Sequence, residues 1–308
     1  MYIILLMLGL FTSRHIQFMI SIALIYALVS IGLVIIMGYG GLVSFGQGAF
    51  YAIGAYSVGL LVKHVGIYSA EILLLAGITI STLVAAGIGA LCSRTRRLAF
   101  AMITLAFTMI IYVILLKFYA FTGGTDGLRI PIVKFFGVIP VRGKDFIISN
   151  EYFLITTIFI LAIFLTDVVI NSPLSLTLRI LRDAEIRAIS IGVSPFKAYT
   201  IAFTYSGFLA GLAGVLYAFL NAHIDPTLAY WTTSGEFVFI SILGGLSSVS
   251  GVVLASIIYV FMKFYLIAYT AYYWQFAIGI LLLFMALMFP RGLSIIPDKI
   301  YRAIFKLK

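Results

Sequence analysis

The sequence predicts an all-α membrane protein, a polytopic bundle of about 8–10 transmembrane segments in a single domain spanning residues 1–308. Hydrophobic residues make up 63% of the chain and charged residues 10%, and the mean hydropathy is +1.20. Uncharged stretches of about 20 residues, the length that crosses a bilayer core, recur along the chain. Two further apolar stretches contain glycine-rich interruptions. So apolar a chain could not cover itself with polar surface in water, which excludes a soluble fold.

Six stretches are long and apolar enough to span a membrane as single helices. Five carry no charge, and the sixth carries Asp167 near its end. Open strands would leave backbone groups unpaired in lipid, and barrel strands would show short alternating segments, so helices are predicted. The six are Ile16–Met37, Ile72–Cys92, Leu98–Leu116, Tyr152–Asn171, Tyr199–Ala222 and Tyr272–Phe289.

The two glycine-rich stretches are predicted to be broken or re-entrant. Gly38–Val62 begins GYGGLVSFGQGAF, and Glu236–Met262 contains ILGGLSSVSG. Glycine and serine at this density weaken a continuous helix, and irregular backbone at membrane depth is tolerated where it is buried or lines a cavity. Long uncharged stretches flank both, which predicts an internal parallel repeat around a central pair of helices. The alternative is that glycine is simply common in membrane helices.

Basic residues between the spans predict which side faces the cytoplasm. If both broken segments are hairpins returning to the side they left, Arg14, the turn Ser93–Arg97 and the loop 172–198 share one side with the C-terminus. If both segments instead cross fully, the more basic side carries nearly as many Lys and Arg residues as it does with hairpins. The arginines of the short turn Ser93–Arg97 favour the hairpins. The sequence therefore predicts an extracytoplasmic loop at 117–151, a cytoplasmic loop at 172–198 and a basic cytoplasmic tail at 291–308.

The loop 172–198 is predicted to contain a short amphipathic helix between Leu176 and Ile191. Ile180, Ala184, Arg187 and Ile191 follow a three-to-four-residue spacing and are expected on one stripe. The charged residues around them make the rest of the helix polar. Two interpretations stay open: an interfacial helix resting on lipid, and a docking element for a cytoplasmic partner.

No nucleotide, metal or catalytic site is predicted in this chain. A phosphate-binding loop needs glycines around a Lys-Ser or Lys-Thr pair, whereas Gly143–Lys144 is followed by Asp145. No pair of histidines has metal-ligand spacing, and no serine-centred nucleophile motif is present. We therefore expect no cofactor here, and expect any ATP to bind partner subunits. The three histidines are His15, His64 and His223.

The distribution of charge also excludes some functions. The net charge is +10, but no nucleic-acid module is present, and the basic residues suit the surface of an anionic membrane. Asp167 and Glu236 are the candidate intramembrane acids, and both are expected near span ends at the interface. Their expected position argues against a proton-coupled carrier. The single cysteine, Cys92, is expected to be an inert core residue.

An ordered set of motifs resembles a known family. GYGGLVSFGQGAFYAIGAY, RRLAFAMITLAF, TGGTDGL, LRDAEIRAISIG with SGFLAGLAGVLYA, and ILGGLSSVSGVVLAS occur in that order between about Gly38 and Pro290. Together they resemble the membrane permeases of branched-chain amino-acid ABC importers. The TGGTDGL loop and the arginine turn resemble the M-type subunit more than its H-type partner.

The resemblance implies an importer of two permeases, two cytoplasmic ATPase subunits and an extracytoplasmic solute-binding protein in the plasma membrane. In this family, a Glu-Ala-Ala…Gly element of the cytoplasmic loop fits a cleft on the ATPase. Here Glu185, Ala188 and Gly192 match it, preceded by Arg182 and Asp183.

The substrate path is predicted from small and neutral polar residues of the two broken segments. Such groups can line a route without holding a substrate tightly, or they can merely stabilise broken helices. The family often has His where this chain has Gln47, which puts an ionisable group there in doubt. The candidate path residues are Ser44, Gln47, Gly244, Gly245 and Ser247.

A row of small residues on one span, Ser206–Gly214, is expected to serve helix packing. For the function, the resemblance implies a permease for branched-chain or related amino acids. A permease for urea or short amides and a channel or ion-coupled carrier acting alone stay as alternatives. Whether the permease pairs with itself or with a different chain is left open.

Overall fold

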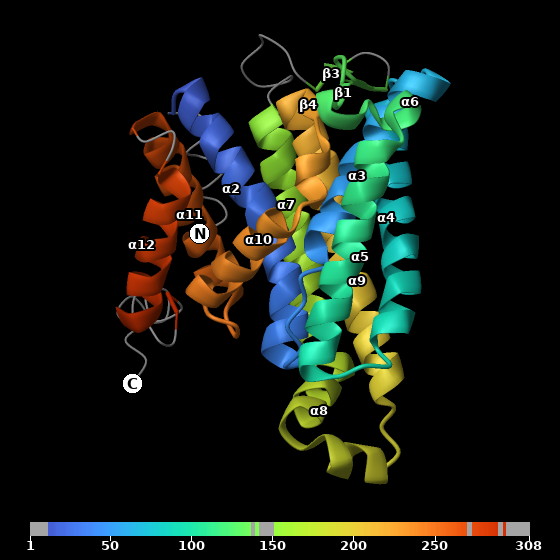
Figure 1. Ribbon diagram of the computed structural model, residues 1–308, viewed down its shortest axis with the longest axis vertical. Helices are drawn as coiled ribbons and strands as arrows, with labels where there is room; N and C mark the ends of the chain where they lie inside the picture. Colours follow the sequence, from blue (N-terminus) through green and yellow to red (C-terminus); the bar gives the residue numbers. More distant parts are fainter. Residues whose placement is uncertain (1–11, 137–138, 142–150, 270–272, 289–291, 294–308) are drawn as a thin grey trace.

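The computed structural model is a bundle of helices with short strands at one end and the helix α8 beyond the other (Figure 1). It describes residues 12–136, 139–141, 151–269, 273–288 and 292–293. Met1–Phe11 and nearly all of the predicted tail 291–308 lie outside the described residues. We refer to the two ends of the bundle as the strand end and the α8 end.

The helices of the bundle account for most of the described chain. Two carry π-helical continuations, η1 after α2 and η2 after α3. In chain order they are α2 (Arg14–Leu33), η1 (Val34–Tyr39), α3 (Gln47–Leu60), η2 (Leu61–Val65), α4 (Ala70–Cys92), α5 (Arg97–Lys117), α6 (Tyr119–Thr122), η3 (Gly124–Asp126), α7 (Glu151–Ile170), α8 (Pro173–Ser190), α9 (Pro195–Asn221), η4 (Pro226–Ala229), α10 (Trp231–Gly244), α11 (Val249–Tyr269) and α12 (Trp274–Met288).

Two pairs of very short antiparallel strands cover the strand end. β1 (Leu128–Arg129) pairs with β4 (His223–Ile224), and β2 (Lys134–Phe135) pairs with β3 (Ile139–Pro140). The first pair ties the loop after α5 to the end of α9, although these segments are far apart in the sequence.

The predicted all-α polytopic membrane fold is confirmed. Within the described residues, six helices are long and apolar enough to cross a membrane: α2 with η1, α4, α5, α7, α9 and α11. The prediction of 8–10 segments also counted the first interrupted stretch and the segment that forms α12, and it placed most of α10 and of α11 in one interrupted stretch. The helices α3 and α10 have 14 residues each. The α-helical part of each is about 21 Å long, less than a hydrocarbon core of about 30 Å, and η2 extends α3 by five residues to Val65.

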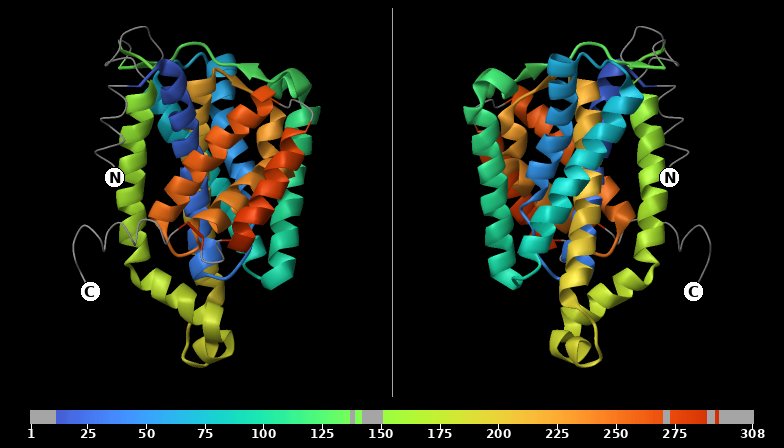
Figure 2. Two further views of the ribbon diagram at one scale, coloured as in Figure 1. Left: turned by 90° about the vertical axis from the view of Figure 1, so that its left-hand side faces the viewer. Right: turned by 90° about the vertical axis from the view of Figure 1, so that its right-hand side faces the viewer.

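Two helices form the centre of the bundle. The most apolar window of the α2–η1 segment is 94% buried and that of α9 is 78% buried, against 28–39% for α4, α5, α7 and α11. Figure 2 shows the outer helices arranged around this centre. The exposed apolar faces of the outer helices are where lipid can solvate the protein.

The small residues of α9 let neighbouring backbones approach closely, as expected. A Cβ added at Gly214 would lie 1.9 Å from the carbonyl oxygen of Tyr51 on α3. A Cβ at Gly211 would lie 2.4 Å from the side chain of Ser81 on α4. Ser81 in turn donates a hydrogen bond to the carbonyl of Gly207, at 3.3 Å. This row therefore serves packing between helices.

The first glycine-rich segment crosses the bundle. Gly41 packs against the side chain of Arg182 on α8, whereas Lys63 donates a hydrogen bond to the carbonyl of Phe121 at the strand end, at 3.4 Å. Between them, residues 40–46 are not helical and α3 continues to the strand end. The prediction of a hairpin returning to its starting side is therefore wrong, because the irregular stretch and the short helix together make up one crossing.

Side chains of α5 satisfy the irregular backbone of this crossing. The hydroxyl of Thr108 donates to the carbonyl of Phe45 at 2.8 Å, and the amide of Phe45 donates to the hydroxyl of Thr104 at 3.2 Å. Both threonines are fully buried. Non-helical backbone survives at membrane depth because the protein supplies these partners.

The second glycine-rich segment, Glu236–Met262, turns back at Gly245–Ser248. From β4 at the strand end, the chain runs through η4 and α10 to this turn at the α8 end, where a Cβ added at Gly38 would lie 1.8 Å from the carbonyl oxygen of Leu246. The helix α11 then returns to the strand end, where the ring of Phe264 contacts that of Phe18 near the start of α2. The helix α10 runs alongside α2, with Ser30 donating to the carbonyl of Phe237 at 3.2 Å.

The predicted parallel repeat is wrong as well. Gly32 packs against Ser206, whereas the later Gly40 packs against the earlier Tyr199, so α2 and α9 are antiparallel. The helices that precede the two interrupted segments therefore run in opposite directions, and so do α3 and α10 within them. As a result α2 begins at the strand end (Figure 1), and the expectation that Arg14 shares a side with the turn Ser93–Arg97 is also wrong.

Candidate functional site

A cleft of about 630 Å³ opens at the α8 end, between α8 and the transmembrane helices. Its walls come from three places: the start of the irregular stretch after η1, the turn between α4 and α5, and the middle of α8. The first residues of α9 close it. The lining residues are Gly40–Leu42, Arg96, Arg97, Leu181–Arg187 and Tyr199. All of the charged side chains that line it come from α8 and the turn.

The predicted helix in the loop 172–198 is present, and it is bent. Pro173 follows Ser172 at the first turn of α8, and Pro195 follows Ser194 at the first turn of α9, where proline fits the helix geometry. Within α8, Ala184 adopts φ −152° and ψ 64°, which is not helical. The helix therefore has an inner arm, Pro173–Asp183, and an outer arm, Glu185–Ser190.

The bend overturns the predicted apolar stripe of Ile180, Ala184, Arg187 and Ile191, because the helical phase changes at Ala184. The buried residues of α8 are instead Ser175, Leu178, Leu181 and Ala188. The outer arm and the residues after it carry three exposed isoleucines: Ile186 is 83% exposed, Ile189 52% and Ile191 74%.

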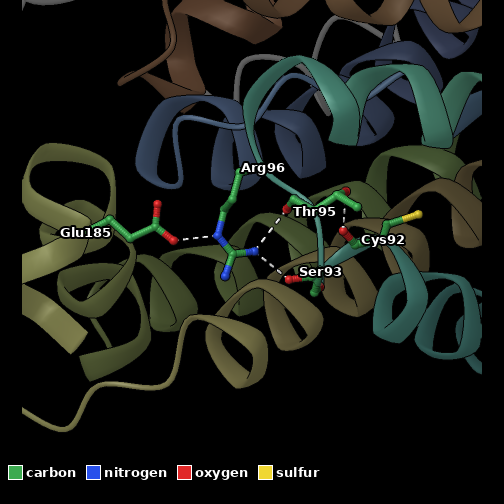
Figure 3. Close-up of polar contacts among 5 residues, drawn as sticks. All are labelled: Cys92, Ser93, Thr95, Arg96 and Glu185. Carbon is green, nitrogen blue, oxygen red and sulfur yellow. Dashed lines mark hydrogen bonds and ion pairs between the residues drawn. The ribbon is translucent and has the colours of Figure 1, made fainter.

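Glu185 ties the outer arm to the turn between α4 and α5. The Nε atom of Arg96 lies 2.5 Å from Oε1 of Glu185, and Nη1 of Arg96 donates to the carbonyls of Ser93 and Thr95 at 2.5 and 2.9 Å (Figure 3). The guanidinium also lies 5.1 Å from the ring centroid of Tyr199 on α9. Arg96 therefore holds α8, the turn and α9 together. Sequence analysis had singled out the turn for its charge and its family resemblance, and not for a contact with α8.

Arg182 ties the inner arm to the end of the first transmembrane segment. Its Nη1 donates to the carbonyl of Gly38, and its Nε donates to Oδ1 of Asp183 at 2.9 Å. That hydrogen bond from Arg182 lowers the pKa of the exposed Asp183 carboxyl below its usual value. The guanidinium of Arg179 lies 4.6 Å from the ring centroid of Tyr39. Two arginines of α8 thus contact the end of η1.

The remaining predicted coupling residues shape the outer arm. Ala188 is fully buried, and the amide of Val193 donates to its carbonyl at 3.0 Å. Gly192 has φ +88°, a conformation that side-chain-bearing residues rarely adopt, and its Cβ position faces open space. Gly192 therefore permits the reversal from α8 into α9.

A second cavity of about 250 Å³ brings coupling and path candidates together. Ser247, from the turn between α10 and α11, lines it with Arg179 and Arg182 of α8. Gly245 has φ +94° and ends α10, and a Cβ at Gly244 would lie 2.3 Å from the Cα of Val252. The two glycines therefore make the tight turn that places Ser247 beside α8.

Ser44 and Gln47 lie elsewhere, in the irregular stretch before α3 and at its first residue. Both are fully buried. The hydroxyl of Ser44 accepts a hydrogen bond from the amide of Gly46 at 3.2 Å. Neither amide atom of Gln47 finds a hydrogen-bond partner in the described part of the chain. The five path candidates therefore form two groups, one inside the bundle and one at the α8 end.

An intramembrane ion pair is the main feature that sequence reasoning missed. Glu236 was expected at a span end, yet it lies in the second turn of α10, paired with Lys263 of α11 at 2.7 Å. Asp167 lies exposed in the last turn of α7. Among the residues that the structure describes, no group of three or more His, Cys, Asp or Glu side chains could hold a metal ion.

Comparisons with known proteins identify the family. The model of the family described as "Branched-chain amino acid transport system / permease component" matches residues 16–286. The high-affinity branched-chain amino acid transport system permease protein LivM of Salmonella typhimurium is 30% identical over 296 residues, covering 89% of this chain and 68% of the relative. LivM of Escherichia coli K12 matches to the same extent. No solved structure matches. The chain is therefore a multi-pass membrane protein that belongs to the branched-chain amino-acid transport permease family.

Proposed function

We propose that the chain is a permease subunit of an ATP-driven importer for branched-chain or related amino acids, and that a second permease completes its translocation path. One observation carries the proposal: α8 lies beyond the bundle (Figure 2), its outer arm presents exposed isoleucines, and partly buried contacts tie it to the transmembrane segments. The names of the two LivM relatives support the class of substrate.

The outer arm of α8 fits a docking role. Ile186, Ile189 and Ile191 are more than half exposed on a segment whose other face is held by Ala188 and Glu185. Apolar side chains gathered on a protruding helix favour burial in a groove of a partner. A cytoplasmic ATPase subunit is the proposed partner, and ATP is hydrolysed there and not in this chain.

Two contacts can transmit a movement of α8 into the membrane. Glu185 and Arg96 connect the outer arm to the turn between α4 and α5, and Arg182 connects the inner arm to Gly38. A shift of α8 therefore acts on three helices at once. The cavity that Ser247 shares with Arg182 extends the connection to the turn between α10 and α11.

The two interrupted segments are the proposed part of the path. Gln47, with its unpartnered buried amide, begins the half-length helix α3, and the amide of the next residue, Gly48, donates to the hydroxyl of Ser234 on α10 at 2.9 Å. The first turns of both half-length helices therefore meet inside the bundle. Neutral polar groups there can contact a substrate briefly, with selectivity left to an extracytoplasmic binding protein.

A carrier that acts alone, driven by an ion gradient, is a second candidate. The pair of Glu236 and Lys263 favours it, because intramembrane charges often belong to ion pathways. Both candidates can be tested in one preparation. Proteoliposomes with the complete importer should take up labelled leucine only with ATP and binding protein. Uptake driven equally well by an ion gradient, or by the purified chain alone, would favour the carrier.

Affinity purification tests the proposed partners. We expect the tagged chain, extracted from native membranes in a mild detergent, to bring down a second permease and one or two ATPase subunits by mass spectrometry. Recovery of the chain alone, in a detergent that preserves other membrane complexes, would contradict the proposal. If the associated binding protein binds urea or short amides and no amino acid, the proposal of an ATP-driven importer stands and its substrate class changes.

A further inference from the structure

A charged pair lies inside the bundle, and the importer mechanism proposed above assigns it no role. The Nζ atom of Lys263 lies 2.7 Å from both carboxylate oxygens of Glu236. The two side chains are 20% and 16% exposed. The pair joins α10 to α11 and is neither sealed in the core nor open on the surface.

The pair lies between the middle of the bundle's thickness and its strand end. The Nζ atom of Lys263 is 5.7 Å from the ring centroid of Tyr26, and the ring of Tyr26 contacts that of Phe237, the neighbour of Glu236, at 5.1 Å. Tyr26 is at the centre of the 26-residue segment Arg14–Tyr39. It is about 18 Å from either end of that segment. Phe264, the neighbour of Lys263, contacts Phe18 near the strand end of the same segment, at 6.2 Å between ring centroids. The pair therefore lies between these two levels, inside the span, where charged groups are costly.

Aromatic side chains line the pair. The Nζ atom of Lys263 lies 5.4 Å from the ring centroid of Trp274 on α12, which is within cation–π range. The ring of Tyr26 lies next to the same cation, with its centroid 5.7 Å from Nζ. The site thus offers one cation, one anion and aromatic faces.

Stability alone gives little reason for such a pair. Replacing a buried ion pair by well-packed apolar residues is often neutral or stabilising, and the neighbouring side chains are already apolar or aromatic. Charges in the membrane interior usually mark a route for a substrate or ion. A binding site for a ligand that carries both a positive and a negative charge requires two such opposite charges side by side.

We propose that Glu236 and Lys263 form a binding subsite for the zwitterionic head group of an α-amino acid. The substrate's ammonium pairs with Glu236, its carboxylate pairs with Lys263, and its apolar side chain lies against the rings of Tyr26 and Trp274. A zwitterion exchanged into a neutral ion pair leaves the net charge of the site at zero, so no unpaired charge enters the membrane interior. The inference rests on the amino-acid function proposed above, and it disfavours urea, which carries no such charges.

The test uses the complete transporter in proteoliposomes and a double variant, Glu236→Gln with Lys263→Met, which removes both charges together. A purely structural pair would tolerate this change, since neither charge is left alone. We expect the double variant to assemble with its partners and keep its thermal midpoint, while leucine uptake falls about a hundredfold. The single variants Glu236→Gln and Lys263→Met, where they fold, should be at least as impaired.

Fluorescence provides a readout that does not depend on transport. The chain has two tryptophans. A Trp231→Phe variant leaves Trp274, beside Lys263, as the reporter. With the permease pair in nanodiscs without binding protein, leucine should change this fluorescence saturably. 4-Methylpentanoate and isoamylamine, which each lack one charge, should not, and the change should vanish in the double variant.

Two different results separate the proposals. A wild-type complex that takes up no amino acid with ATP overturns the proposed function. An active wild type whose double variant transports leucine at the same rate, or whose fluorescence responds equally to both singly charged analogues, overturns the zwitterion subsite and leaves the importer intact.

Discussion

The contact between Glu185 and Arg96 allows stability and coupling to be separated. Replacing Glu185 with glutamine removes the charge and keeps the shape of the side chain. Arg96 keeps its hydrogen bonds to the carbonyls of Ser93 and Thr95, so the turn between α4 and α5 stays ordered. The change should loosen the outer arm of α8 without disturbing the bundle.

The expected loss on replacing Glu185 follows from how exposed the side chains of Glu185 and Arg96 are. The two side chains are 31% and 33% exposed, so solvent screens much of their attraction despite the 2.5 Å separation. Ion pairs of this kind contribute about 1 kcal/mol or less. That corresponds to a roughly fivefold loss in the population of the docked arm. For a protein of this size, the global thermal midpoint should fall by only about 3 °C.

The assay measures leucine uptake and ATP hydrolysis together in proteoliposomes that hold the complete importer. We expect Glu185→Gln to lower uptake per ATP hydrolysed several-fold, and Glu185→Lys, which repels Arg96, to lower it further. Glu71→Gln is the matched control, because Glu71 accepts a hydrogen bond from the amide of Phe136, in the loop that also forms the strands of the strand end. Unchanged uptake per ATP in both Glu185 variants would refute the role of this contact.

Four further substitutions, one of them a control, test the packing and the docking arm. Gly214→Val places atoms against the carbonyl of Tyr51 and should destabilise the protein by about 3 kcal/mol, whereas Gly87→Val, with open space around its Cβ, should cost less than about 1 kcal/mol in thermal unfolding. Ile186→Asp should abolish co-purification of the ATPase while the chain stays inserted, and retention of the ATPase would count against docking by the outer arm. Gly192→Trp imposes a side chain at φ +88° and should uncouple hydrolysis from uptake; normal transport by this variant would contradict the docking model.

The long helices could be predicted because one physical requirement dominates them. A segment that crosses lipid must be apolar for about 20 residues, and this leaves a clear pattern in any single sequence. The predicted span Ile72–Cys92 corresponds to α4, Ala70–Cys92, and Leu98–Leu116 corresponds to α5, Arg97–Lys117. Charged or polar residues limit both spans, so their ends were visible too.

The course of the interrupted segments could not be predicted, because it depends on partners far away in the sequence. The irregular backbone around Phe45 is stable where Thr104 and Thr108 supply hydrogen bonds, and nothing near Phe45 announces them. Charge counts gave nearly equal scores to hairpins and to full crossings. The bend at Ala184 was missed for a related reason: the contacts of Arg182 with Gly38 and of Glu185 with Arg96 hold the two arms of α8 in different phases.

The misplacement of Glu236 has a physical cause that applies beyond this residue. When Glu236–Met262 is read as one span, its charged first residue falls at the membrane surface. The chain instead reaches the middle of the bundle through η4 and the residues around it, and α10 begins there, so the start of the apolar run lies deep inside. A crossing made of an irregular half and a helical half brings the end of an apolar stretch to the centre of the membrane. A charged residue at the end of a broken span is therefore a candidate for an intramembrane site. Its partner lies at the same depth on a neighbouring helix, as Lys263 does here, and not three or four residues away on the same helix.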